Sequence, residues 1–208
     1  MMTTSAPDDR QIVADLLADP AGSDLPLDHL HDELVTRAAG TDLLDVSYRT
    51  VDSPVGSLLL ATTPAGLVRV AFEREDHDAV LAQLAADVSP RILRAPARLD
   101  DAARQLDEYF AGARHRFDLP VDLQLAHGFR RTVLDHLRDI AYGTTASYAT
   151  VAAASGSPAA VRAVGSACAH NPVPVVVPCH RVVRSDGSIG QYLGGTDAKQ
   201  TLLDLEAA

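Results

Sequence analysis

The chain has 208 residues, of which 47% are hydrophobic, and a formal net charge of −10. This composition excludes a disordered chain, and no apolar run approaches the roughly 18 residues that a membrane span requires. The N-terminal sequence lacks the basic-then-apolar layout of a secretion signal. Only two cysteines occur, so neither a disulfide framework nor a zinc-binding cluster is indicated. We therefore expect a cytoplasmic protein with reduced thiols, without a membrane segment or a bound metal.

The negative charge is concentrated in the N-terminal part of the chain. Seven Lys and Arg residues and six Asp and Glu residues follow Ala126, so residues 127–208 carry a formal charge of +1 and residues 1–126 carry −11. An acidic protein is not expected to attract nucleic acid. The nearly neutral C-terminal part nevertheless permits DNA binding.

Residues 1–44 are predicted to form an acidic, partly helical extension. Apolar side chains recur at helical spacing on both sides of the turn-forming stretch 20–24, which predicts two short helices. The sequence of this extension indicates no function.

Residues 45–123 are predicted to form a small α+β domain. Alternating apolar residues and the turn Pro64-Ala65-Gly66 indicate a β-meander of about three strands between residues 46 and 72. The remaining predicted elements are a helix around 80–84, a short strand at 92–93, a helix over 99–112 and an extended segment at 117–123. No chemistry is indicated within these elements, so we interpret the domain as a scaffold.

The C-terminal part, residues 124–208, has mainly helical patterning. A first amphipathic helix is predicted around residues 129–140. Ser147 can cap a second helix, and Ser157 can cap a third in which Pro158 takes the first position. Because only a short Gly-containing turn separates the second helix from the third, the two form a helix-turn-helix pattern.

The predicted third helix has an unusually smooth outer face. Its core-facing stripe comprises Val161, Val164 and Cys168. The neighbouring stripe holds one cation among small residues: Arg162, Gly165, Ser166 and Ala169. A helix that reads bases in the major groove normally presents several long polar side chains, so a sequence-specific regulator is disfavoured. The stripe suits close approach to a DNA backbone or minor groove and, equally, a tight helix–helix contact.

A cysteine and a histidine are adjacent in Pro178-Cys179-His180-Arg181. The valines at 175–177 predict a short buried strand that ends at Cys179. Burial raises the pKa of a thiol, so this cysteine can react only if a partner takes its proton or stabilises the thiolate. Successive side chains of an extended segment point to opposite faces. We therefore expect contact between Cys179 and His180 through a turn or a bridging water rather than directly.

A set of motifs follows in a fixed order along the C-terminal part. They are Ser147-Tyr148, Val161-Arg162-Ala163-Val164-Gly165, Asn171-Pro172-Val173-Pro174, Pro178-Cys179-His180-Arg181-Val182, Gln191-Tyr192-Leu193-Gly194-Gly195, and the closing Lys199, Leu202-Leu203 and Glu206. Together they closely resemble the O6-alkylguanine-DNA alkyltransferases, from about Phe129 to Glu206. A weaker likeness to the N-terminal domain of that family covers residues 46–123.

The resemblance implies that the chain is a DNA repair protein acting on duplex DNA. It would transfer the alkyl group of O6-alkylguanine, with O4-alkylthymine as a further candidate, irreversibly to Cys179. Each molecule would act once, as a monomer, with no metal or organic cofactor. In this family the helix-turn-helix binds the minor groove and the damaged base is flipped into a pocket beside the cysteine.

The resemblance also assigns roles to single residues. Arg162 would fill the gap left in the base stack, with Gly165, Ser166 and Ala169 against the DNA, and Tyr148 would crowd the phosphate and later support the base. His180, oriented by Glu206, would accept the thiol proton through a water, and Asn171 would join the recognition helix to the active-site turn. The substrate pocket would comprise Val176, Pro178, Tyr192, Leu193 and Gly194, with Tyr192 donating to the leaving base.

Two other functions stay open on the sequence alone. Relatives that only flag the lesion for other machinery typically lack the nucleophile, so such a sensor would require that Leu193 or the altered loop after it blocks transfer to Cys179. A Cys-His hydrolase would require an oxyanion hole and a histidine from another element, and the sequence indicates neither.

Overall fold

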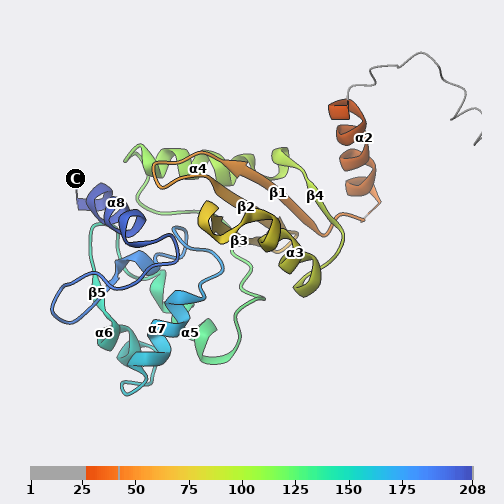
Figure 1. Cartoon of the computed structure of the whole chain (residues 1–208). Coiled ribbons are helices and arrows are strands. Elements are labelled where there is room, and N and C mark those ends of the chain that lie inside the picture. The colour runs from red at the N-terminus through yellow and green to blue at the C-terminus, as the bar shows by residue number, and fades with distance from the viewer. Residues whose placement is uncertain (1–26, 42, 208) are drawn as a thin grey trace, which may run out of the picture.

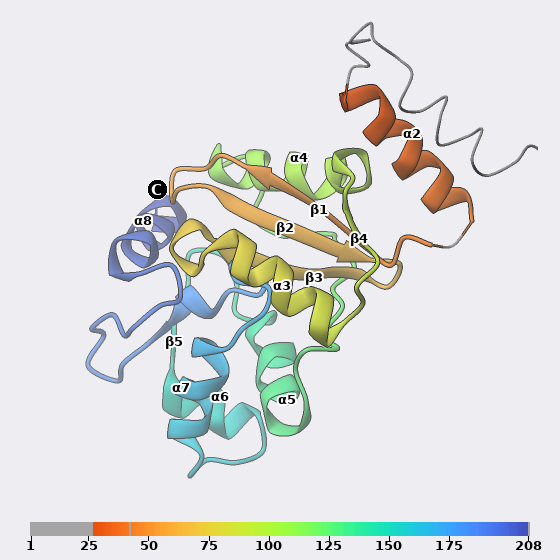
Figure 2. The ribbon, with the colours of Figure 1, turned by 45° about the vertical axis from the view of Figure 1, so that its right-hand side comes forward.

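The structure, a computed structural model, describes residues 27–41 and 43–207 and has a mixed α+β fold, which confirms the predicted fold class (Figure 1). A sheet with two covering helices forms one part of the molecule, and the C-terminal helices and loops form the other (Figures 1 and 2). The first of the two helices predicted in the extension lies outside the described residues. Among the residues described, no helix is long and apolar enough to cross a membrane.

The sheet is the predicted meander with one added strand. Its strands are β1 (Val46–Val51), β2 (Leu58–Thr63), β3 (Gly66–Phe72) and β4 (Ile92–Arg94). They lie in the order β3-β2-β1-β4, with antiparallel pairing of β1 to β2 and β2 to β3, and parallel pairing of β1 to β4. The short β4 confirms the strand predicted at residues 92–93.

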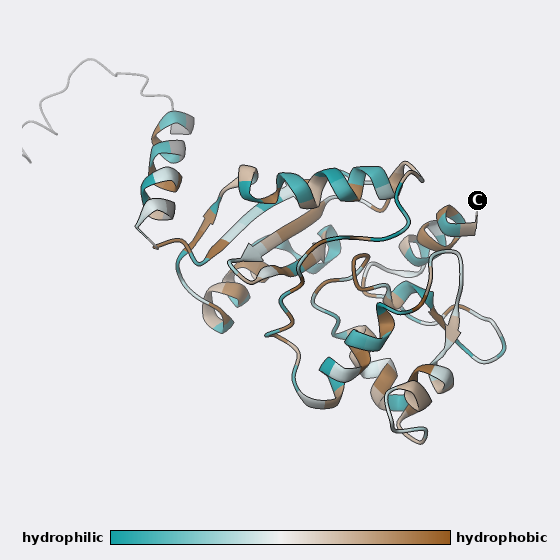
Figure 3. Cartoon of the chain, turned by 180° about the vertical axis from the view of Figure 1, so that it is seen from behind, coloured by the Kyte–Doolittle hydropathy of each residue, from teal (hydrophilic) through white to brown (hydrophobic). Residues whose placement is uncertain are grey.

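Both faces of this sheet are buried, because alternate side chains of β2 and β3 pack on different helices. Leu59 and Ala61 lie in one apolar cluster with Val80 and Leu84 of α3 (His77–Asp87). Leu58 and Leu60 lie in a second cluster with residues of α4 (Asp100–Phe110), such as Leu106. Figure 3 shows the outer side of α4 as largely hydrophilic, in keeping with a helix that covers a sheet.

The helices of the C-terminal part agree with the predicted order. They are α5 (Gly128–Leu137), α6 (Tyr148–Ala154), α7 (Val161–Ala169) and α8 (Thr196–Ala207), with the short strands β5 (Ala146–Ser147) and β6 (Val182–Val183) paired in parallel. The hydroxyl of Ser147 accepts a hydrogen bond from the Thr150 amide at 3.0 Å, which confirms the predicted cap of α6.

The predicted start of α7 is wrong by several residues. Residues 157–160 form a separate turn, in which the amide of Ala160 donates to the carbonyl of Ser157 at 2.8 Å. The helix begins only at Val161, after Ala160, which has no side-chain cap. As a result Val161 lies in the first turn with 38% of its surface exposed, outside the core stripe predicted for it.

The predicted strand at residues 175–177 is also wrong. Val175 has a φ of 71°, in the left-handed region, and the chain turns back so that Pro174 and Val177 form an isolated bridge. The valines are buried as an apolar run should be. The flanking prolines, Pro174 and Pro178, have no amide N–H to donate, so a regular ladder cannot continue here.

The free edge of β3 is covered by two segments from later in the chain. The amide of Leu67 donates to Pro120 at 2.8 Å, and the amide of Val70 donates to the carbonyl of Pro172 at 2.8 Å. The second bond ties the sheet directly to the segment between α7 and Cys179. One apolar cluster also runs from the sheet through α4 and α5 to α7, so the two parts share a core.

Helix α2 (Leu27–Gly40) confirms the second helix predicted in the extension. It packs on the remainder of the molecule through a small cluster that contains Ala38, Leu44 and Ala95.

The contact between β3 and residue 120 makes a test of the fold. We expect Gly66→Ala to lower the free energy of unfolding by more than about 2 kcal/mol, because the residue has a φ of +138° and an added Cβ would lie 2.4 Å from the Pro120 carbonyl oxygen. Gly112→Ala is the control: its φ is +70°, but nothing lies within 4 Å of the added carbon. Urea denaturation measures both, and equal losses would contradict the steric account.

Candidate active site

A 3-10 turn, η3 (Cys179–Arg181), carries the cysteine and the histidine of the central motif. Both side chains are buried, with Cys179 2% exposed and His180 0% exposed. Because a 3-10 helix has about three residues per turn, adjacent side chains diverge. In the part of the chain that the structure describes, no hydrogen bond joins Sγ of Cys179 to the His180 ring, in agreement with the expectation that the two do not pair directly.

The partner of the Cys179 thiol is Asn171. Its Nδ2 donates to Sγ at 3.1 Å and to the carbonyl of Val177 at 2.8 Å, and its Oδ1 accepts from the amide of Val173 at 3.0 Å. The side chain of Asn171 is completely buried. One amide group therefore fixes the active-site turn and supplies a donor that stabilises a thiolate.

The two cysteines differ in the interactions that counteract the rise in pKa caused by burial. Burial raises the pKa of Cys179 to about 11, against the hydrogen bond from Asn171 and the positive charge of Lys199. Burial raises the pKa of Cys168 further, and no hydrogen bond counters it. Cys179 is thus the more readily ionised thiol, but at neutral pH it is protonated and needs a base in order to act as a nucleophile.

The carboxylate of Glu206 in α8 lies at the centre of a buried polar network. Its Oε1 accepts from the His180 ring at 2.8 Å, from the Tyr109 hydroxyl at 2.6 Å and from Arg181 at 2.9 Å, and its Oε2 accepts from Nε of Arg181 at 2.8 Å. Burial by itself would raise the pKa of Glu206, but the hydrogen bonds from His180 and Arg181 outweigh it and lower the pKa to about 2. The carboxylate is therefore ionised throughout the neutral range.

His180 is held in one neutral form. Burial lowers its pKa, with help from the nearby positive charges of Arg181 and Lys199, while Glu206 opposes the shift. An ionised carboxylate can only accept, so Nε2 of His180 carries the hydrogen and Nδ1 has the free lone pair. This Nδ1 is buried and has no partner among the described residues, so it is available to take a proton.

A cavity of about 560 Å³ opens between helices α6 and α7 and the sheet part. Its lining residues come from three segments: Tyr148, Val161, Gly165 and Ala169 from α6 and α7; Arg184, Gly190, Gln191, Tyr192 and Leu193 from the C-terminal loop; and Arg74 and Glu75 from η1 (Glu73–Glu75). The structure thus brings together five predicted residues that are far apart in the sequence: Tyr148, Gly165, Ala169, Tyr192 and Leu193.

Tyr192 connects this cavity to the polar network. Its ring packs edge-on against His180, with 6.3 Å between the ring centroids, and against Phe72 at 5.5 Å. Its hydroxyl is buried near the backbone of Val175 and has no partner with hydrogen-bond geometry among the described residues. Burial raises the pKa of Tyr192 well above the usual value, so the hydroxyl is protonated and can donate.

The other predicted residues lie elsewhere. Arg162 and Ser166 are exposed on α7 and do not line this cavity. Val176 and Pro178 line a second cavity, of about 680 Å³, beside Tyr142. Gly194 packs against Phe72, whose ring would lie 2.7 Å from an added Cβ, so glycine is needed there for close packing rather than for the cavity wall.

Two residues of the network were missed by the sequence analysis. Tyr109 lies in the helix predicted over residues 99–112, for which the sequence indicated no chemistry. A buried tyrosine hydroxyl usually requires a polar partner, and this rule could have indicated that such a partner exists. Arg181 was quoted in the central motif without a role. Its guanidinium bonds both oxygens of Glu206 and the carbonyl of Ile140 at 2.5 Å, an arrangement that depends on contacts between distant segments.

The chain matches two family models. Residues 128–208 match the DNA-binding domain of 6-O-methylguanine DNA methyltransferase, and residues 46–123 match its ribonuclease-like domain. A methylated-DNA--protein-cysteine methyltransferase of Mycolicibacterium paratuberculosis is 41% identical over 161 residues, which cover 77% of this chain and 92% of the relative. The constitutive enzyme of the same name from Bacillus subtilis is 38% identical over 160 residues, covering 76% and 94%.

Solved structures give the same result. The Mycobacterium tuberculosis O6-methylguanine methyltransferase superposes with a TM-score of 0.69 at 37% identity, covering 78% of this chain and 93% of that one. The structure of the M. tuberculosis protein in complex with DNA superposes with a TM-score of 0.67 at 36% identity, covering 77% and 92%.

The fold and the sequence are thus those of a DNA alkyltransferase. The chain belongs to the 6-O-methylguanine DNA methyltransferase family, whose curated members are methylated-DNA--protein-cysteine methyltransferases. This membership confirms the family and the enzyme class predicted from the sequence. The roles of the single site residues stay predictions.

Because His180 is buried and neutral, the free energy of unfolding is expected to depend on pH. In the unfolded chain this histidine takes up a proton near its ordinary pKa of about 6.5, whereas burial keeps it neutral in the folded protein. The stability that it contributes is therefore present above that pH and is lost as the pH falls, by up to about 1.4 kcal/mol per pH unit. We expect the free energy of unfolding of His180→Gln to fall less steeply between pH 7 and 5 than that of the unmodified protein.

The matched control is His127→Gln, which replaces an exposed histidine. Its urea denaturation should follow the unmodified protein over the same pH range. Parallel pH dependence of the His180→Gln variant and the unmodified protein would show that His180 is not held neutral in the fold.

Proposed function

We propose that this methyltransferase repairs O6-alkylguanine in duplex DNA by moving the alkyl group to Cys179, once in the life of each molecule. The observation that carries the proposal is the bond from Asn171 to the Cys179 thiol beside a neutral histidine with a free Nδ1. A protein thioether has no good leaving group, so the product is not reversed by the same chemistry. O4-alkylthymine is a further candidate substrate.

The reaction that we propose is an in-line displacement at the alkyl carbon. The proton of Cys179 passes through a water to Nδ1 of His180, while Glu206 stabilises the imidazolium that forms. The thiolate then attacks the alkyl carbon, a carbon–sulfur bond forms and the bond to O6 of guanine breaks. The hydroxyl of Tyr192 donates to the departing base and limits the negative charge that develops on it.

We propose that DNA binds along the exposed face of α7, the second helix of the helix-turn-helix. Gly165 and Ala169 have no bulk there, and nothing lies within 4 Å of a Cβ added at Gly165, so a minor groove can approach closely. Arg162, exposed at the start of α7, enters the base stack when the damaged base leaves it. Tyr148, which lines the cavity, faces the flipped nucleotide.

The proposal also covers cofactors, oligomeric state and cellular compartment. The thiolate displaces the base directly from the alkyl carbon, and we propose that this step uses no metal or organic cofactor. We propose a monomer that acts in the cytoplasm, where reducing conditions keep the Cys179 thiol free. A sensor that binds the lesion without transfer is the alternative, and the intact arrangement around Cys179 disfavours it.

The acceptor can be tested by the mass of the intact protein. After incubation with duplex DNA that carries O6-methylguanine, we expect a stoichiometric gain equal to one methylene group. Cys179→Ala should show no gain, whereas Cys168→Ala, which removes the other buried thiol, should gain as the unmodified protein does. Binding to the lesion duplex with no mass gain would instead establish the sensor.

A second test concerns the smooth face of α7. Gly165→Ala should raise the free energy of unfolding by about 0.5–1 kcal/mol, because alanine favours a helix and the added carbon meets nothing. The same methyl group should weaken binding to duplex DNA. Ala163→Ser adds one atom to an exposed residue off this stripe and is the control. If Gly165→Ala binds DNA as well as the control does, the proposed DNA face is wrong.

A further inference from the structure

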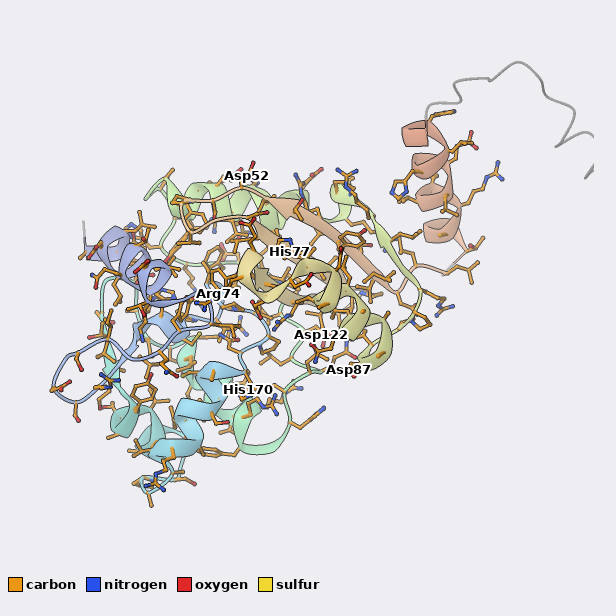
Figure 4. The ribbon with its side chains drawn as sticks, viewed as in Figure 1. Asp52, Arg74, His77, Asp87, Asp122 and His170 are labelled. Carbon is orange, nitrogen blue, oxygen red and sulfur yellow. The ribbon has the colours of Figure 1, made fainter. Side chains whose placement is uncertain are left out.

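Arg74 lies in the sheet part of the molecule but lines the cavity that faces α7. It belongs to η1, which follows β3 directly, and it shares the cavity wall with Tyr148, Gly165 and Arg184. Figure 4 labels Arg74 where the sheet part meets the helical part, above His170 at the end of α7. A cation from the acidic half of the chain is therefore presented to the proposed DNA site.

The backbone that carries Arg74 is firmly held. The carboxylate of Glu75 accepts from the amide of Phe72 at 2.8 Å and from Arg69 at 2.5 Å, which fixes the turn. The guanidinium of Arg74 then passes so close to the C-terminal loop that a Cβ added at Gly195 would lie 2.5 Å from its Nη1. The fixed turn on one side and the loop at Gly195 on the other thus place Arg74 on the wall of the cavity.

Arg74 has no anionic partner within the described residues. The adjacent carboxylate, Glu75, is already paired with Arg69. Other arginines of the sheet part, such as Arg49 and Arg91, form ion pairs with aspartates. Arg184 forms no ion pair within the described residues, and its guanidinium donates to the hydroxyl of Ser188 at 3.4 Å. Its charge also acts on Asp186, whose pKa is lowered chiefly by hydrogen bonds from Ser188. Among the residues described, the wall of the cavity thus carries Arg74, which has no carboxylate partner, and Arg184, which forms no ion pair.

We propose that Arg74, together with Arg184, binds phosphate groups of the DNA strand that carries the target base. This inference rests on the proposed function and extends the DNA-binding surface beyond the helix-turn-helix into the sheet part. The face of α7 supplies a single cation, Arg162, so further cations must come from other elements if an acidic protein is to bind DNA. The guanidinium fork matches the geometry of phosphate oxygens and binds two of them at once.

The test compares Arg74→Gln with Arg98→Gln in the full chain. Arg98 is an exposed arginine of η2 (Pro96–Leu99), on the sheet part and outside this cavity, so both variants lose the same charge. Fluorescence anisotropy measures binding to an unmodified duplex and to one carrying O6-methylguanine over a series of salt concentrations. Each phosphate contact contributes about 0.9 to the slope of log affinity against log salt.

We expect Arg74→Gln to lower this slope by about 1 and to weaken binding to both duplexes roughly threefold, while Arg98→Gln leaves both unchanged. Arg74→Lys keeps the charge and should retain the slope. An unchanged slope in Arg74→Gln overturns the proposal, as does a loss confined to the lesion duplex, which would indicate contact with the base. Failure of the unmodified protein to bind either duplex would instead overturn the proposed function.

Discussion

The ionised carboxylate of Glu206 is the interaction on which both the fold and the chemistry depend. An isolated charge in the interior is very costly, and removing one partner of a buried pair typically destabilises a protein by about 3–5 kcal/mol. Here the charge is compensated from two directions, by Arg181 and His180 of η3 and by Tyr109 of α4. The last helix, the active-site turn and the sheet part are therefore held by one group.

The same compensation sets the protonation of the site. Arg181 balances the charge of Glu206, so the histidine beside them is free to be neutral and to act as a base. Burial is the main cause that keeps the pKa of His180 low, and the positive charge of Arg181 acts in the same direction against Glu206. The ion pair thus supports the neutral histidine that the proposed proton transfer requires.

Much of this could be predicted from the sequence. The β-meander, the cap of α6 and the adjacent Cys179 and His180 depend on residues that are close together in the sequence. Such features can be predicted from a single sequence. The start of α7 was predicted wrongly because residues 157–160 form a separate turn, closed by the bond from the Ala160 amide to the Ser157 carbonyl, before the helix begins at Val161. The sequence could not show which groups Tyr109 and Arg74 lie against, because only the tertiary structure brings Glu206 to Tyr109 and the wall of the cavity to Arg74.

The sheet part contributes more to the site than a scaffold would. Phe72 packs on Tyr192 and against Gly194, and the bond from Val70 to Pro172 joins the edge of β3 to the segment that leads into the active-site turn. A substitution in either part is therefore expected to alter the shape of the cavity between them.

Val175 combines a strained backbone conformation with a buried side chain. A β-branched residue in the left-handed region costs on the order of 1–3 kcal/mol, and this one is completely surrounded by other side chains. Glycine would relieve the backbone but would leave a hole in the core. The buried side chain therefore holds the turn in its strained conformation, four residues before Cys179. A turn that is fixed by its surroundings in this way limits the motion of the Cys179 thiol.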